Sequence, residues 1–207
     1  MGRPATINRR AVALAALRLI DDGGLEALSL ERIAAELGVR GPSLYHHFPD
    51  KAAILSHVAA VVLGDLEMER DVDDWRQWLV EVSLTFYRRV LEHPNAAAIL
   101  MQFLPDVLAL RGLAHATALL TAAEIEPSVQ ALLVEGCEKL SWGWALQRAF
   151  VAVGGEERRT PAVLSAEWPE LAVALEHGSR RWSNEQILEA ALYAFVDGVV
   201  GRYAVDD

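Results

Sequence analysis

The stretch VRGPSLYHHFPDK, residues 39–51, decides the fold of the N-terminal part of the chain. Gly41-Pro42 can open a helix, because proline suits the first helical position, and Pro49 stops that helix. Leu44 and Phe48 are four positions apart, so they share the face that packs inward. The pattern predicts a two-turn helix over Pro42–Phe48, whose outward side chains are Ser43, Tyr45, His46 and His47.

Two further helices are predicted immediately before this stretch. The first covers residues 8–22 and ends at Gly23-Gly24, and its apolar face comprises Val12, Ala13, Ala16, Leu17, Leu19 and Ile20. The second begins after Ser29, a favourable N-cap residue, and is closed by Gly38. Two short helices joined by a tight glycine-containing turn and packed under a first helix form a helix-turn-helix. A short second helix with a polar outer face is the kind of element that enters a DNA major groove.

The rest of the chain also reads as helical, since alanine and leucine dominate and β-branched runs are rare. A fourth helix, capped by Asp50, is expected to bury Ala52, Leu55, Val58, Ala59, Val62 and Leu66. Further helices are expected over residues 74–93, 95–103, 106–123, 128–153, 167–177 and 184–203, with a mobile loop over 154–165. The predicted fold is all-α, with a helix-turn-helix domain over residues 1–51, a connecting helix over about 50–67, and a larger helical domain over 52–207.

The composition limits the functional classes. The net charge of −10 is uneven: residues 1–51 hold seven Lys and Arg against six acids, whereas residues 52–207 hold 12 against 23. The first part could therefore meet a polyanion if its bases share one face. The single cysteine, Cys137, excludes a disulfide framework and fits a reducing, cytoplasmic setting. We see no secretory signal and no transmembrane helix in the sequence.

The block SLERIAAELGVRGPSLYHHFPDKAAIL, residues 29–55, resembles the DNA-binding signature of the tetracycline-repressor (TetR) family. The matching features are the LGV turn, a small residue followed by Pro, Ser, Leu and Tyr, the histidine after the aromatic residue, and Phe-x-x-Lys. The larger part resembles the helical ligand-binding and dimerisation domain of that family in length and helix order. Within residues 74–94, the residue pattern DW…L…F…HP is similar to the sequences of the tetracycline-repressor branch of the family.

The resemblance implies which residues face DNA: Arg40, Gly41, Pro42, Ser43, Tyr45, His46, His47 and, as a phosphate contact, Lys51. Tyr45 could instead be a half-buried packing residue, and His46-His47 a solvated pair. Arg3, Arg9 and Arg10 could form a basic arm or a disordered tail.

The larger domain is expected to bind a small molecule among its aromatic residues, which include all six tryptophans. In the resembled repressor a histidine helps to hold a drug-bound magnesium ion, but residues 96–105 contain no histidine. An apolar or aromatic effector, uncharged or cationic, therefore fits better. The ligand-binding candidates are Val82, Phe86, Leu100, Phe103, His115, Glu138, Trp142 and Gln147.

Small residues on the helices over 128–153 and 184–203 would allow close approach of helices. By resemblance these two helices pair with their mates in a homodimer, although intrachain packing alone is the alternative. The functional hypothesis is a ligand-responsive repressor that binds a palindromic operator, with no metal or cofactor. An all-α enzyme and a protein-binding adaptor are the rivals, but the sequence has no nucleophile triad order, HExxH motif or phosphate-binding glycine loop.

Overall fold

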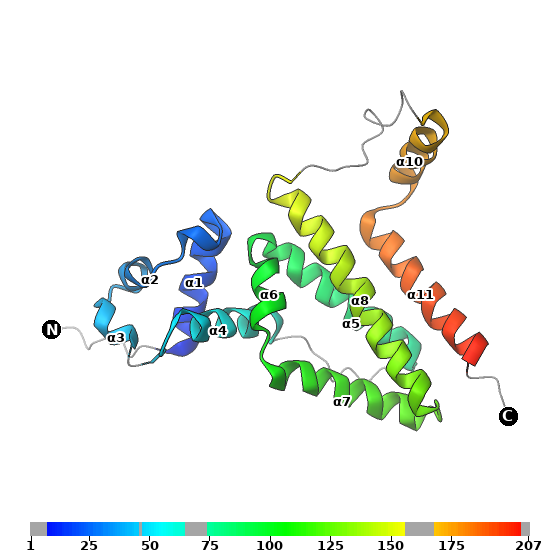
Figure 1. Cartoon of the computed structure of the whole chain (residues 1–207), viewed down its shortest axis with the longest axis horizontal. Coiled ribbons are helices and arrows are strands. Elements are labelled where there is room, and N and C mark those ends of the chain that lie inside the picture. The colour runs from blue at the N-terminus through cyan, green and yellow to red at the C-terminus, as the bar shows by residue number, and fades with distance from the viewer. Residues whose placement is uncertain (1–7, 46, 65–73, 156–167, 204–207) are drawn as a thin grey trace.

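The computed structural model describes residues 8–45, 47–64, 74–155 and 168–203, with the side chains of residues 42, 45 and 107–109 left out. Every regular element of the described part is helical, as expected. The elements are α1 (Arg9–Gly23), η1 (Leu25–Ala27), α2 (Leu30–Leu37), α3 (Gly41–Tyr45), α4 (Lys51–Leu63), α5 (Trp75–Glu92), η2 (Pro94–Ala96), α6 (Ala97–Phe103), α7 (Asp106–Ala122), α8 (Pro127–Ala152), α10 (Pro169–Arg181) and α11 (Asn184–Tyr203). Figure 1 shows α1–α3 at one end of the molecule, with α4 running from them to the larger group of helices.

The N-terminal helices form the predicted three-helix arrangement. The Asn8 side chain caps α1 by accepting a hydrogen bond from Arg10 N at 2.9 Å, and Gly24 N closes the helix on Ile20 O. Ser29 caps α2 by accepting from Arg32 N at 3.2 Å. All six residues of the predicted apolar face of α1 are buried, as are Leu44 and Phe48. The spacing of apolar residues therefore fixes how α1, α2 and α3 pack.

Helix α4 connects the two parts of the molecule because it packs on both. It contacts α1 on one side and α5 and α6 on the other. Its buried residues come in adjacent pairs four positions apart: Ile54, Leu55, Val58, Ala59, Val62 and Leu63. The expectation that Ala52 is buried was wrong, since it lies in the first turn, before this wide stripe begins, and is exposed. Leu66 lies outside the described residues.

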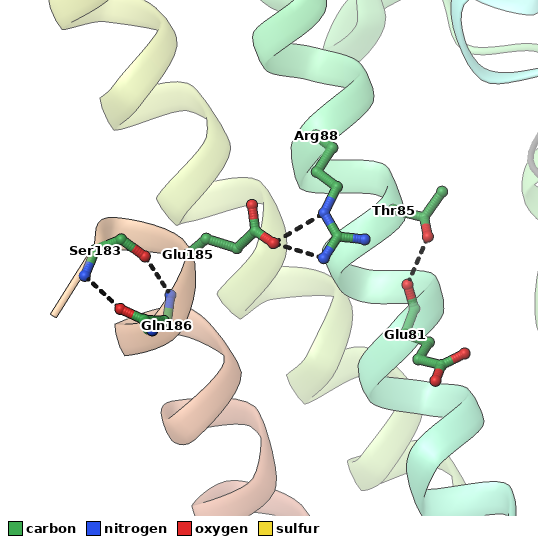
Figure 2. A network of polar contacts seen from close by, with 6 residues as sticks. All are labelled: Glu81, Thr85, Arg88, Ser183, Glu185 and Gln186. Atoms are coloured by element: carbon green, nitrogen blue, oxygen red, sulfur yellow. Dashed lines mark hydrogen bonds and ion pairs between the residues drawn. The ribbon is translucent and has the colours of Figure 1, made fainter.

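The larger group of helices is built around α5, α8 and α11, which contact one another in all three combinations. Helices α5 and α11 are antiparallel: Arg88 Nη2 lies 2.5 Å from Glu185 Oε1, and Arg76 Nε lies 3.8 Å from Asp197 Oδ1. The two arginines and the two acids are each twelve positions apart, so one helix register satisfies both pairs. Figure 2 shows the Arg88–Glu185 end of this contact, next to the Ser183–Gln186 cap of α11.

Helices α8 and α11 approach closely at one glycine. A Cβ atom on Gly136 would lie 2.0 Å from the Phe195 ring, so no larger residue fits there without a shift. This glycine serves packing within the chain. On the same two helices, Gly143, Gly198 and Gly201 have open space where a Cβ would be.

The differences from the sequence-based boundaries are small and have local causes. Helix α3 ends at Tyr45, earlier than predicted, and the amides of His47 and Phe48 both donate to Leu44 O. A proline ring disfavours helical backbone at the residue before it. This explains why Phe48, which precedes Pro49, does not extend the helix. Helix α10 begins and ends later than predicted. The predicted mobile loop over 154–165 lies mostly outside the described residues.

Candidate DNA-reading surface and effector region

The turn between α2 and α3 depends on the backbone of Gly38. This residue has φ 64° and ψ 28°, a left-handed conformation that costs other L-residues energy. Gly38 N donates to Ala35 O, and Val39 N donates to Ala34 O at 2.9 Å, so the turn satisfies the last carbonyls of α2. Arg40 follows at once and is exposed, with its carbonyl accepting from Ser43 N. We call α2, residues 38–40 and α3 the reading head.

The reading head presents part of the predicted DNA-facing set. Arg40 and Lys51 are exposed, and Gly41, Ser43 and His47 are half-buried. The side chains of Pro42 and Tyr45, and all of His46, lie outside the described residues. The contacts of these residues with DNA stay predictions.

Lys51 has a structural contact that sequence reasoning did not foresee. Its Nζ donates to Leu28 O at 3.3 Å, in the segment that leads into α2. The ammonium group therefore sits beside the start of the reading head, where its positive charge is compatible with a phosphate contact.

One contact holds the reading head on α1, and a second holds the residue Phe48, which follows the head, on α4. Arg18 on α1 donates to Glu36 on α2 at 2.5 Å, and the Phe48 ring meets the His57 ring of α4 edge-on, with centroids 5.1 Å apart. A hydrogen bond from the backbone and one from Ser29 lower the pKa of Glu31, which lies in the first turn of α2 where negative charge is favourable.

A polar junction joins α1 to the larger part of the molecule. Nδ1 of His93, which follows α5, donates to Asp21 Oδ2 at 2.8 Å, and Asn95 Nδ2 in η2 donates to Asp21 O at 2.9 Å. The second carboxylate oxygen, Oδ1 of Asp21, is buried and has no hydrogen-bond partner among the residues that the structure describes. We call Asp21, His93 and Asn95 the junction latch. Asp21 lies more than seventy positions before His93 and Asn95 in the sequence, and sequence reasoning missed their contact.

Helix α5 carries a stripe of apolar residues at every fourth position, comprising Trp78, Val82 and Phe86. The Phe86 ring meets the Trp142 ring of α8 edge-on at 4.5 Å between centroids. The Trp78 ring meets the imidazole of His115 on α7 at 5.0 Å. We call these five residues the aromatic stripe; it unites four of the predicted ligand-binding residues with Trp78.

The other predicted ligand-binding residues are placed differently. Leu100 on α6 is fully buried and Phe103 is half-buried. Glu138 and Gln147 on α8 are both exposed. Contacts of these residues with a ligand remain predictions, and the exposed pair lacks the burial of the aromatic stripe.

Cys137 lies on α8 among buried side chains, and this burial raises the pKa of its thiol to about 12. Its sulfur is therefore kept in the protonated, unreactive form near neutral pH. Among the described residues, no group of three or more His, Cys, Asp and Glu side chains could hold a metal ion. None of the described helices is both long and apolar enough to cross a membrane.

Helix α3 follows a tight turn, is supported by the other two N-terminal helices, and is joined through α4 to a larger helical domain. This arrangement defines a helix-turn-helix protein. Residues 14–58 match the model of the family described as bacterial regulatory proteins, tetR family. Over these residues the chain is similar to the tetR family.

The relatives agree with this assignment. The tetracycline repressor protein class C of Escherichia coli is 38% identical over 96 residues, which cover 45% of this chain and 44% of that protein. The match thus spans less than half of that relative's length. A possible TetR family transcriptional regulator from Streptomyces coelicolor A3(2) superposes with a TM-score of 0.80 and 20% identity, covering 94% of this chain and 99% of the other. TetR-Q116A from Acinetobacter baumannii AYE, in complex with minocycline, superposes with a TM-score of 0.78 and 21% sequence identity, covering 98% of each chain. At these identities the two structures show a shared fold.

Proposed function

We propose that the protein is a ligand-responsive transcriptional repressor that binds a palindromic operator as a homodimer. The observation that carries this proposal is the reading head, which presents Arg40 and Ser43 and has the ammonium group of Lys51 at the segment leading into α2. Cationic and hydroxyl donors of this kind bind phosphates and base edges. The tetR-family match over residues 14–58 covers the same segment.

A dimer is required because one short reading head contacts few base pairs, whereas two at a fixed separation read two half-sites. Helices α8 and α11 supply the surface. Leu132, Phe150, Tyr193 and Tyr203 are exposed on them, beside the open glycines 143, 198 and 201. Small residues allow helices to approach, and exposed apolar groups are stabilised by burial in an interface.

The effector is a small, mostly apolar molecule that binds at the aromatic stripe and favours a conformer in which the two heads no longer match the operator. The supporting feature is an apolar, ring-lined region with few polar groups, which is the usual composition of a small-molecule site. A tenfold loss of operator affinity needs about 1.4 kcal/mol of coupling between the two sites. The minocycline complex of the Acinetobacter neighbour supports ligand binding by a protein of this fold.

The experiment is selection of duplexes from random-sequence DNA, followed by titration of the selected duplex at several salt concentrations. We expect an inverted repeat. We also expect log K to fall with log salt by about 0.9 per phosphate contact, because counterions are released from DNA.

Enrichment of no sequence, together with affinity that is insensitive to salt, would contradict the DNA-binding proposal and favour a protein-binding adaptor. Enrichment of a single half-site would contradict only the dimeric mode of binding.

A further inference from the structure

The aromatic stripe contains a polar atom that the described residues leave unsatisfied. Nε2 of His115 is buried and has no hydrogen-bond partner in the described part of the chain. A buried polar group of this kind is uncommon in folded proteins and costs stability compared with one that is paired. The described residues supply no partner for this nitrogen, which leaves its hydrogen-bonding capacity available to a bound ligand.

The side chains around His115 indicate which other chemical groups that ligand carries. The imidazole lies against the Trp78 ring, and the same face of α5 continues through Val82 to Phe86 and its contact with Trp142. On α7, the neighbours of His115 on the inward side are Ala116 and Leu120, both buried. The Trp78 ring and apolar side chains of α7 therefore lie next to an imidazole nitrogen that can donate or accept, depending on the tautomer.

We infer that His115 is the polar anchor of the effector site, and that the effector is an uncharged aromatic molecule bearing a hydroxyl group. This inference rests on the proposed function and names the ligand class of its site. A hydroxyl both donates and accepts, so it pairs with either tautomer of the imidazole. The aromatic ring of the ligand would pack on the indole and phenyl rings of the stripe, where offset or edge-on contacts are favourable.

In this role the unpaired nitrogen of His115 lowers the stability of the ligand-free protein and strengthens the binding of the ligand. The His115→Phe substitution keeps a planar ring against Trp78 and removes the unsatisfied nitrogen. The apo variant should therefore melt no lower than the wild type, and it should lose the ability to distinguish a hydroxyl from a methyl group.

The test uses three probes of the same ring system: 2-naphthol, 2-methylnaphthalene and 2-naphthoate, titrated by calorimetry into the full-length protein. The wild type should bind 2-naphthol about tenfold or more tightly than 2-methylnaphthalene, as expected for one hydrogen bond to a buried group. In His115→Phe this preference should fall to about twofold or less. The control is His177→Phe on α10, an exposed histidine whose Nδ1 donates to Val173 O. It should keep the full preference.

Three results would overturn the inference: equal affinity of the wild type for naphthol and methylnaphthalene, absence of binding for both, or tightest binding of the naphthoate anion. A clear drop in melting temperature of apo His115→Phe would show instead that the imidazole is structural. Operator binding is measured separately, so a protein that binds its operator and fails these titrations leaves the proposed function intact.

Discussion

At the scale of a single residue, Gly38 sets the angle between α2 and α3 through its positive φ of 64°. Gly38→Ala should lower the free energy of unfolding by about 1–2 kcal/mol, since a Cβ is disfavoured in the left-handed region. Open space at this position excludes a steric clash as the cause. Urea denaturation measures the change.

The matched control is Gly178→Ala on α10, where a Cβ also meets nothing but the backbone is helical. There alanine should stabilise the protein by roughly 0.5–1 kcal/mol, because glycine is the poorer helix former. If both variants shift stability in the same direction, backbone conformation is not what makes Gly38 necessary.

Lys51 provides a second test at this scale. Lys51→Ala should weaken binding to every duplex by a similar factor and reduce the slope of log K against log salt by about 0.9, the value for one phosphate contact. The variant also loses the bond to Leu28 O, which is worth about 1 kcal/mol of stability, so melting temperature is recorded alongside affinity.

Lys139→Ala removes the same charge from α8, where the lysine pairs with Glu135 on the exposed surface. We expect an unchanged salt slope for that control. A change in sequence preference on Lys51→Ala would assign the residue to base readout, contrary to the prediction.

At the scale of elements, the junction latch holds the end of α1 against η2. Asn95→Ala should cost about 1 kcal/mol, because Asp21 O loses its partner while half-buried. The last turn of α1 should then open more often. Hydrogen exchange should be faster at the amide of Gly24, which donates to Ile20 O, and unchanged within α8.

The comparison variant is Gln77→Ala, which removes an exposed amide bond to Glu81 within α5 and should leave α1 unaffected. Equal exchange at Gly24 in the Asn95 variant and the wild type would show that the latch carries no stability between the two parts.

The elements themselves could largely be predicted from the sequence, because their signals are local. Ser29, Asp50 and Asp74 cap the helices that they precede, and apolar spacing identified the buried face of α1. The local signals also placed the end of α2 at Gly38.

The junction latch and the Arg88–Glu185 pair could not be predicted in this way. Arg88 and Glu185 are 97 positions apart, and the pairing depends on the antiparallel register of α5 and α11. Similarly, the sequence indicated His115 as a ligand-binding candidate, but it could not show that Nε2 of His115 is buried while the imidazole of His177 is exposed, since only packing decides which is covered.

At the scale of the whole molecule, the proposed dimer can be tested at a glycine that the single chain does not use for packing. Gly198→Lys on α11 places a charged side chain at a position where a Cβ atom would meet no described atom within 4 Å. The variant should fold normally by circular dichroism and sediment as a monomer, because a lysine would be buried unpaired between the copies. Its operator affinity should fall sharply.

Gly178→Lys on α10 adds the same side chain at an equally open helical position away from α8 and α11. It should remain dimeric. A dimeric Gly198→Lys protein would exclude this face of α11 from the interface.

The burial of Cys137 has a practical consequence for following the switch itself. Because the chain has no other cysteine and this thiol is held protonated, a cysteine introduced at the surface becomes the sole reactive site for a nitroxide label. Glu26 in η1 is exposed and lies next to the reading head in the chain. A dimer of Glu26→Cys protein would carry one spin on each head, and pulsed electron spin resonance would report the distance between them. That distance should change when an effector is added, without any need to mutate the site where the effector binds.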